Sequence, residues 1–509
     1  METTTTMSWL LPLLIALPAA GALIACLVGN DAAGQRRFGV AWSLLTAAFG
    51  TALLCTPVAP FSVPWFSLWG TGATVHLALA SDGLSAWLVQ LAGWLTPLAI
   101  LGAGGIAAGR MRAFVVCVLA MQALMIGALL ARDLVLFLLC YEGMLVPMIA
   151  IIALFGAADR RDAALRFFLF TAAGSVAILA ATWWLAAKLH TTDLAALAAG
   201  IDLLSGEARG WLFWAFVLAF AVKVPLVPLH GWQAPTYEQT PGAGVALLGG
   251  VMAKVGLFGL IALTIPLFPE EAARHATLFI VLGVIGCLGG ALAAIVQDNA
   301  KAMIAYSSLS HLGLVVAGVF TFQTAALHGA AVQMVAHGLS LAALFLLIGA
   351  MEARTRLSGL HDFGSLAGIA PRFAVLFVTA ALATAGLPGT LNFVGEFLLL
   401  IGLYQHGGLW LAGAAGLSVI LTVVYLLILV QRWLFGEQRP ATDAPIEDLG
   451  PAEVAAVAPL LAAALVLGFW STPIQRSAGA AADRHAAEAR AALAAPPAAI
   501  RSATSASTP

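Results

Sequence analysis

Apolar segments about as long as a bilayer is thick recur along nearly the whole chain. A helix needs roughly 20 apolar residues to cross the hydrocarbon core. We expect such spans centred near residues 18, 48, 92, 121, 144, 176, 220, 253, 285, 311, 341, 388, 422 and 461. Lipid offers no hydrogen-bond partner to backbone groups, so these segments must form helices. The sequence therefore predicts an all-α polytopic membrane protein with about fourteen transmembrane helices.

The composition supports a membrane protein and excludes several other classes. Hydrophobic residues make up 62% of the chain and charged residues only 9%, whereas a soluble domain is about 25% charged. The net charge of −1 and the lack of a basic run argue against nucleic-acid binding. All five cysteines lie in apolar segments and none forms a CxxC pair. We therefore expect small packing residues there, rather than disulfides or a metal or cofactor site.

The two ends of the chain and its basic loops predict an orientation. The first apolar segment lacks a positive flank and many spans follow it, so we expect a transmembrane helix rather than a removed signal peptide. The loops after odd-numbered spans hold thirteen Lys and Arg and those after even-numbered spans hold four, which predicts cytoplasmic odd loops and both termini on the outer side. The odd-loop residues are Arg36, Arg37, Arg110, Arg112, Arg160, Arg161, Arg166, Lys301, Arg354, Arg356, Arg372, Arg432 and Arg439, and the even-loop residues are Arg132, Lys188, Arg209 and Arg274.

A few ionisable side chains lie inside the predicted spans. A charge at bilayer depth costs about 2.5–3.5 kcal/mol on insertion scales, so each needs a functional reason. Arginine, which keeps its proton, is confined to loops and span ends, while lysine and histidine, which can release theirs, are used inside. These residue types predict a proton relay. Its candidate members are Glu142, Lys223, Lys254, His311, His337 and Glu396, with His230 as a possible addition.

Structural roles remain open for several of these residues. Glu142 and Lys223 could form a plain structural ion pair, and His230 lies near a span end where it is as easily a packing residue. His311 and His337 could be satisfied polar residues in a packed interior. Lys254, in the middle of a span without an acidic neighbour in the sequence, is the residue for which a structural role is hardest to argue.

Two of the predicted spans are interrupted. In AVKVPLVPLH, Pro225 and Pro228 remove helix hydrogen bonds just after Lys223. In TAGLPGTLNFVGEF, a Gly-Leu-Pro-Gly sequence precedes Glu396. Irregular backbone at membrane depth is tolerated only where protein or water satisfies it. Two broken helices five spans apart, each with one ionisable group, are typical of inverted repeats with sites on discontinuous helices.

These residues also carry a family resemblance. The stretches are CYEGMLVPM, KVPLVPLHGW, GGVMAKVGLFG, DNAKAMIAYSSLSHLG, QMVAHGLSLAALFLLIGAMEARTR and GLPGTLNFVGEF. In this order the chain resembles the antiporter-like membrane subunits of proton-pumping NADH:quinone oxidoreductase, respiratory complex I. The resemblance implies fourteen helices with two inverted five-helix repeats. The implied divisions are residues 1–112 for helices 1–3, 113–268 and 269–440 for the two repeats, 441–473 for helix 14, and an Ala-rich tail 474–509 that is either a surface helix or disordered.

The resemblance implies a role for each candidate residue. Glu142 matches the carboxylate that pairs with the lysine of the first broken helix, here Lys223, and Lys254 matches the central lysine. His311 and His337 match histidines that continue a hydrated axis. Glu396 matches the last ionisable group, where the M-type (chain 4) subunit resembles this chain in carrying Glu and the other antiporter-like subunits carry Lys.

The chain departs from the family pattern at two places. Tyr141 stands where the family usually has tryptophan. After KVPLVPLHGW the chain reads QAPTYEQTPGAG, so that Pro235 and Tyr237 replace the usual Asp and His. This second departure bears on local proton uptake or on contact with the next subunit.

The resemblance further implies a setting for the chain. It implies a bacterial inner membrane protein whose partners are other complex I membrane-arm subunits and lipid, with no redox centre of its own. NADH, FMN, iron–sulfur clusters and quinone are expected in partner subunits. The alternatives are a subunit of a multisubunit Na⁺/H⁺ antiporter or membrane-bound hydrogenase, a stand-alone solute carrier, and a passive assembly scaffold.

Overall fold

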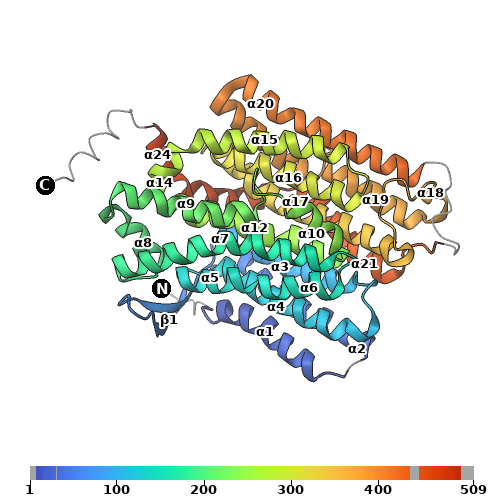
Figure 1. Ribbon diagram of the computed structural model, residues 1–509, viewed down its shortest axis with the longest axis horizontal. Helices are drawn as coiled ribbons and strands as arrows, with labels where there is room; N and C mark the ends of the chain where they lie inside the picture. Colours follow the sequence, from blue (N-terminus) through green and yellow to red (C-terminus); the bar gives the residue numbers. More distant parts are fainter. Residues whose placement is uncertain (1–6, 30, 436–445, 495–509) are drawn as a thin grey trace.

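The computed structural model describes residues 7–29, 31–435 and 446–494, which form a bundle of long, roughly parallel helices (Figure 1). Twelve helices in these ranges are long and apolar enough to cross a membrane. The predicted boundary at residues 440/441, Arg439, and the end of the tail beyond residue 494 lie outside the described residues.

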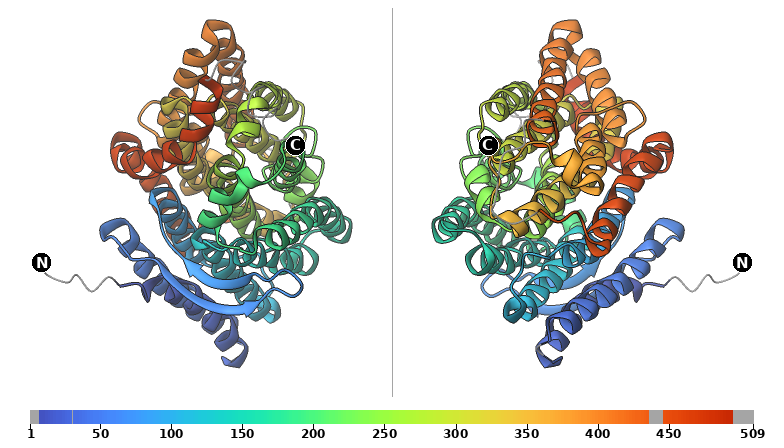
Figure 2. Two further views of the ribbon diagram at one scale, coloured as in Figure 1. Left: turned by 90° about the vertical axis from the view of Figure 1, so that its left-hand side faces the viewer. Right: turned by 90° about the vertical axis from the view of Figure 1, so that its right-hand side faces the viewer.

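The first part of the chain forms three long helices and one hairpin. These are α1 (Leu10–Leu27), α2 (Ala32–Cys55), β1 (Phe61–Ser67), β2 (Thr74–Leu79) and α3 (Gly83–Leu101). The antiparallel β1–β2 pair was not predicted. The hairpin forms because Gly70 and Gly72, between the two strands, have positive φ and allow the chain to reverse. Figure 2 shows the N-terminal helices along one outer edge of the bundle.

The central part of the chain contains the first broken helix. Its elements are η1 (Ala108–Arg110), α4 (Met111–Leu130), α5 (Leu134–Gly143), α6 (Leu145–Phe155), α7 (Arg160–Leu189), α8 (Leu194–Gly200), η2 (Ile201–Leu203), α9 (Gly206–Lys223), α10 (Gln233–Gln239), α11 (Gly242–Leu247), η3 (Leu248–Met252), α12 (Ala253–Gly259), η4 (Leu260–Thr264), α13 (Ile265–Leu267) and α14 (Pro269–Arg274). Segments η3 and η4 are π-helical and lie on either side of α12.

The remaining part contains the second broken helix and a helical tail. Its elements are α15 (Ala276–Ile295), α16 (Ala300–Val319), α17 (Thr324–Thr355), α18 (Leu366–Ile369), α19 (Pro371–Thr384), α20 (Leu391–Leu434), α21 (Pro451–Phe469), α22 (Thr472–Ile474), η5 (Gln475–Gly479), α23 (Ala480–His485) and α24 (Ala487–Ala494).

The long helix α20 is two membrane passes joined at Gly408. This residue has φ 69° and ψ −164°, which no helix contains. A Cβ atom added to Gly416 would lie 3.8 Å from Leu400 Cδ2, although sixteen positions separate the two residues. The halves therefore lie side by side as a hairpin. With these halves counted separately and α9 included, the described passes agree with the predicted fourteen.

Glycines bring α15 and α16 into close contact. A Cβ atom on Gly313 would lie 2.7 Å from the backbone nitrogen of Cys287, and one on Gly283 would lie 2.6 Å from the backbone nitrogen of Ala317. Backbone atoms cannot move aside as a flexible side chain can. Small residues at helix interfaces are the usual means of close packing in membranes.

We predict that Gly313→Ala destabilises the protein by about 1–3 kcal/mol, the usual cost of overpacking. Gly289→Ala is the matched control, because nothing lies within 4 Å of an added Cβ there. The thermal midpoint of the purified protein measures the difference. Equal midpoints for the two variants would contradict close packing at Gly313.

The tail after α21 folds back onto one end of the bundle. Trp87 Nε1 donates to Ser477 Oγ at 2.8 Å, and Arg490 Nε donates to the Phe322 carbonyl at 2.7 Å. His485 Nε2 lies 2.9 Å from Asp82 Oδ2. The described tail is thus a docked helical segment, and it lies at the same end as the β1–β2 hairpin (Figure 1).

The tail contact depends on a charged carboxylate. Burial alone would raise the pKa of Asp82, but the hydrogen bond from His485 and the charge of Arg132 outweigh it and hold that pKa well below its usual range. A carboxyl with a lowered folded-state pKa stabilises the fold above its ordinary pKa. That stabilisation is lost as the pH falls through the lowered value.

We predict that Asp82→Asn loosens the tail, because the substitution removes the charge but keeps a side chain that caps α3 well. A lost charge-assisted hydrogen bond costs about 1.5–3 kcal/mol. Proteolysis within residues 472–494 of the assembled complex should be faster, and acidification should bring the unsubstituted protein toward the same rate. Asp202→Asn, at an exposed carboxylate, is the control. Unchanged proteolysis of Asp82→Asn would contradict the role of this charge.

Candidate functional site

The first broken helix is interrupted where the sequence predicts. Helix α9 ends at Lys223 and α10 begins at Gln233. The amide of Leu226 donates to the Ala221 carbonyl at 2.8 Å, and the Trp232 indole donates to the Val222 carbonyl at 2.9 Å. The carbonyls freed by the prolines are therefore satisfied by the protein itself, as membrane depth requires.

Lys223 is buried at this break, with 3% of its surface exposed. Its Nζ donates to the Tyr141 carbonyl at 2.8 Å and lies 3.3 Å from the centre of the Tyr141 ring. The ring face attracts the ammonium group electrostatically. Tyr141, one of the departures from the family pattern, thus keeps an aromatic face for this lysine.

Glu142 lies next to Tyr141 but is directed elsewhere. Its Oε2 accepts a hydrogen bond of 2.5 Å from Ser175 of α7, and its Oε1 is buried without a hydrogen bond to any described group. The predicted direct pair of Glu142 with Lys223 is not among the ion pairs of the described residues. Successive helical residues point about 100° apart, so Tyr141 faces Lys223 while Glu142 faces α7.

Lys254 is completely buried between the two π-helical segments. Its Nζ hydrogen-bonds the Gly249 carbonyl and lies 2.7 Å from Nδ1 of His337. A nitrogen–nitrogen contact of this length needs one donor and one acceptor. Lys254 and His337 therefore share one proton position, and a proton can pass between them without a large movement.

His311 joins this pair to Glu396. The His311 and His337 ring centres are 5.2 Å apart, and His311 Nε2 lies 3.1 Å from Glu396 Oε1. His311 Nδ1 lies 2.8 Å from the Ser307 carbonyl. Both ring nitrogens thus face oxygen acceptors, which suits the doubly protonated ring paired with a carboxylate.

The second broken helix holds Glu396 in place. Gly386 has φ +70°, and a Cβ atom there would lie 2.5 Å from Glu396 Oε2, so only glycine fits the turn and the carboxylate together. The carbonyls of Ala383 and Thr384 lie at this break, and that of Ala383 already accepts from the Gly386 amide at 3.2 Å. Asn392 Nδ2 donates to the first at 2.8 Å, and His311 Nε2 lies 3.2 Å from the second.

The structure brings four of the predicted residues into one row and leaves the others beside it. Lys254, His337, His311 and Glu396 are connected as described. Lys223 and Glu142 are at the first break, and His230 is in the turn after it, with a buried Nδ1 that has no hydrogen bond to a described group.

Sequence reasoning missed the residues that support these groups. They are Trp232, Ser175, Asn392 and Gln333, whose Nε2 lies 3.2 Å from Asn392 Oδ1. Trp232 and Asn392 could have been found, because each closely follows a helix break, where carbonyls lose their ordinary helical donors.

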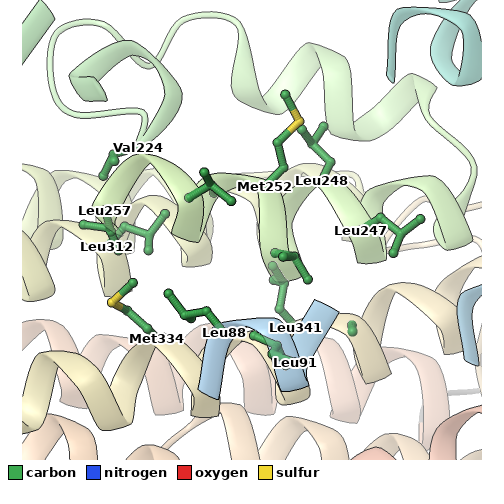
Figure 3. Close-up of a cluster of buried hydrophobic side chains, with 14 of the residues drawn as sticks. Leu88, Leu91, Val224, Leu247, Leu248, Met252, Leu257, Leu312, Met334 and Leu341 are labelled. Atoms are coloured by element: carbon green, nitrogen blue, oxygen red, sulfur yellow. The ribbon is translucent and has the colours of Figure 1, made fainter. Parts of the chain in front are cut away.

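Apolar side chains surround the central lysine. Figure 3 shows Leu88 and Leu91 of α3 gathered with Met334 and Leu341 of α17 on one side of the segment that carries Leu247 and Leu257, and the Met252 side chain on its other side. Interactions between polar groups are stronger in such surroundings than in water. Among the described residues, no group of three or more His, Cys, Asp or Glu could hold a metal ion.

A bundle with two broken helices and a buried row of lysine, histidine and carboxylate side chains defines the antiporter-like class of membrane proteins. Residues 131–422 match the family described as NADH:quinone oxidoreductase/Mrp antiporter, TM. The chain belongs to this family, and within it to the M-type subunits of NADH:quinone oxidoreductase.

Similar proteins and structures support this assignment. The chain is 35% identical to the protein named NADH-quinone oxidoreductase subunit M of Rhodobacter capsulatus over 91% of this chain and 93% of that protein. It is 32% identical to NADH-ubiquinone oxidoreductase chain 4 of Marchantia polymorpha over 90% and 93%. A chain of respiratory complex I from Thermus thermophilus superposes with a TM-score of 0.85 at 31% identity, covering 95% of this chain and all of that one. A chain of the Mrp complex from Dietzia sp. DQ12-45-1b shares the fold, with a TM-score of 0.82 at 22% identity, covering 96% of this chain and all of that one.

We predict that Trp232→Phe destabilises the first break by about 1–3 kcal/mol, because the Val222 carbonyl loses the indole N–H donor while the aromatic bulk is kept. The thermal midpoint of the complex measures this loss. Trp211→Phe, at a partly exposed indole, is the control. A Trp232→Phe complex as stable as the control would show that the indole does not satisfy the break.

Proposed function

We propose that this chain is a membrane-arm subunit of a proton-translocating NADH:quinone oxidoreductase and that protons move along the row Lys254, His337, His311 and Glu396. The single observation that carries this proposal is the alignment of four buried groups, with contacts of 2.7 and 3.1 Å at its two ends and the two imidazole ring centres 5.2 Å apart between them. Each of these ionisable groups costs free energy to bury in a membrane. A row of them is therefore better explained by proton transfer than by a contribution to the stability of the fold.

The proposed mechanism is electrostatic. Lys223, held by the carbonyl and ring of Tyr141, carries a positive charge near the start of the row. A conformational change from a partner subunit alters the electrostatic interaction between Lys223 and Glu142, whose carboxylate is held by Ser175. The positive charge of Lys223 then raises the free energy of the proton on Lys254, because two like charges repel strongly in a low dielectric.

The proton then has a defined direction within this chain. Doubly protonated His311 first gives its Nε2 proton to the Glu396 carboxylate. A proton then passes from Lys254 to Nδ1 of His337 as the proton on the other ring nitrogen of His337 moves to the now neutral His311. His337 Nε2 has no hydrogen bond to a described group and is the atom from which that second proton leaves. The carboxylate of Glu396 ends the row at the second break.

The redox chemistry belongs to partner subunits in this proposal. They supply NADH oxidation, FMN, iron–sulfur clusters and quinone reduction, and this chain supplies proton-exchanging groups. The two inverted repeats at residues 113–268 and 269–440, and termini on the outer side of a bacterial inner membrane, are parts of the same proposal. The α19–α20 break mirrors the α9–α10 break in support of the repeats.

We predict that Lys254→Ala lowers NADH-driven quinone reduction and proton uptake together by about tenfold or more in inverted vesicles, since about 1.4 kcal/mol of barrier already gives tenfold. Lys188→Ala is the matched control, because Lys188 is at a helix end. A native gel checks that the complexes assemble. Normal rates in an assembled Lys254→Ala complex would instead favour the passive scaffold.

A further inference from the structure

A chain of buried amide groups leads from the second helix break to Glu396. Asn392 Nδ2 donates to the Ala383 carbonyl at 2.8 Å, and Gln333 Nε2 of α17 donates to Asn392 Oδ1 at 3.2 Å. Gln333 and Asn392 are both completely buried. A buried amide costs free energy unless its polar atoms are hydrogen-bonded, so the two side chains hold each other in a defined arrangement.

The order of donors and acceptors in this chain follows from the Ala383 carbonyl. A carbonyl oxygen only accepts hydrogen bonds, so the Asn392 atom that faces it must be the NH₂ group. The Asn392 oxygen is then left for Gln333, which must present its own NH₂ group in return. That nitrogen carries two hydrogens, and Asn392 takes one of them.

The second hydrogen of the Gln333 amide is available to Glu396. Gln333 Nε2 lies 3.5 Å from Glu396 Oε1. The same oxygen lies 3.1 Å from His311 Nε2, so donors from two different helices meet at one carboxylate atom. Hydrogen bonds donated to a carboxylate favour its ionised form over its protonated form.

Glycines allow α17 to approach α20 closely enough for this contact. Gly395 directly precedes Glu396, and a Cβ atom on Gly395 would lie 3.0 Å from the Gln333 Cα atom. A Cβ atom on Gly329, one turn before Gln333, would lie 2.7 Å from the backbone nitrogen of Leu399. A side chain at either glycine would push the helices apart and withdraw the amide from the carboxylate.

Titratable groups face Glu396 from two packed elements. His311 faces it from α16, with His337 of α17 and then Lys254 behind. Tyr425, in the second half of α20, interacts electrostatically with the carboxylate. The Gln333 amide differs from all of these groups, because it donates a hydrogen bond at every pH and never carries a charge.

We propose that Gln333 is a positioning residue that keeps Glu396 ionised, with its Oε1 atom directed at His311, until a proton arrives. This role rests on the proposed function and adds a control on its last group. In that proposal His311 gives its Nε2 proton to Glu396, which can accept the proton only as a carboxylate. Gln333 sets this state of readiness without itself belonging to the row.

We predict that Gln333→Met makes Glu396 about tenfold more reactive toward a hydrophobic carbodiimide at the same pH, as the loss of one hydrogen bond to the ionised form would give. Carbodiimides react with protonated carboxyls, and methionine keeps the length of glutamine but donates no hydrogen bond. The reaction is run on the whole complex without NADH and measured by mass spectrometry of the Glu396 peptide. Glu142, whose carboxylate is bonded to Ser175, is the internal reference and should react at an unchanged rate.

Gln122→Met is the matched control variant. Gln122 of α4 is also completely buried, and its Nε2 donates to the Gly93 carbonyl at 3.4 Å. This variant should leave the reactivity of Glu396 unchanged. Wild-type reactivity of Glu396 in Gln333→Met would overturn the proposal, and so would an equal increase in both variants, since that would indicate a general loosening. If the reagent reaches Glu396 in neither variant, the infrared absorption of its protonated carboxyl, assigned by its loss in Glu396→Gln, makes the same comparison.

Turnover provides a second readout that a packing role would not move. NADH-driven proton uptake by Gln333→Met, relative to the unsubstituted complex, should fall about tenfold at neutral pH and recover as the pH rises, because a higher pH removes the extra proton from Glu396. A deficit that stays constant with pH would contradict this role. Normal pumping by Lys254→Ala would overturn the proposed function, whereas the reactivity of Glu396 in the resting complex would still test Gln333.

Discussion

Every polar feature of this protein depends on one constraint, which is that backbone groups released inside a membrane must find partners within the protein. The two breaks meet it in different ways. At the first, the Trp232 indole takes the free carbonyl of Val222. At the second, Asn392 and His311 take the carbonyls of Ala383 and Thr384. Without these contacts neither broken helix could hold an ionisable side chain at membrane depth.

At the second break, structural and functional contacts are made by the same residue. His311 satisfies a backbone carbonyl, pairs with Glu396 and lies beside His337. A substitution here would therefore disturb stability and proton transfer together. Lys254 differs, because its partners are a π-helical carbonyl and His337, and the surrounding shell is apolar. The effect of a Lys254 substitution on proton transfer should therefore be the easiest to separate from its effect on folding.

The first break is more loosely connected than the second. Lys223 is held by the backbone and ring of Tyr141, while Glu142 is bonded to Ser175 on another helix. The Oε1 atom of Glu142 is buried without a hydrogen bond to a described group, so a new partner there would remove a desolvation penalty. The proposed function accordingly places the conformational change at the first break and the end of the proton path at Glu396.

The sequence by itself determined the membrane class, the number of passes, both helix breaks and the ionisable residues, because hydrophobic length, proline and glycine act locally. It did not predict the β1–β2 hairpin or the docking of the tail. Only the tertiary structure decided which of those residues touch. It brought Lys254, His337, His311 and Glu396 together, and it directed Glu142 to Ser175 while keeping it within electrostatic range of Lys223. The reason is that side-chain direction depends on how the helices are rotated against each other, and that rotation results from packing between residues far apart in the sequence.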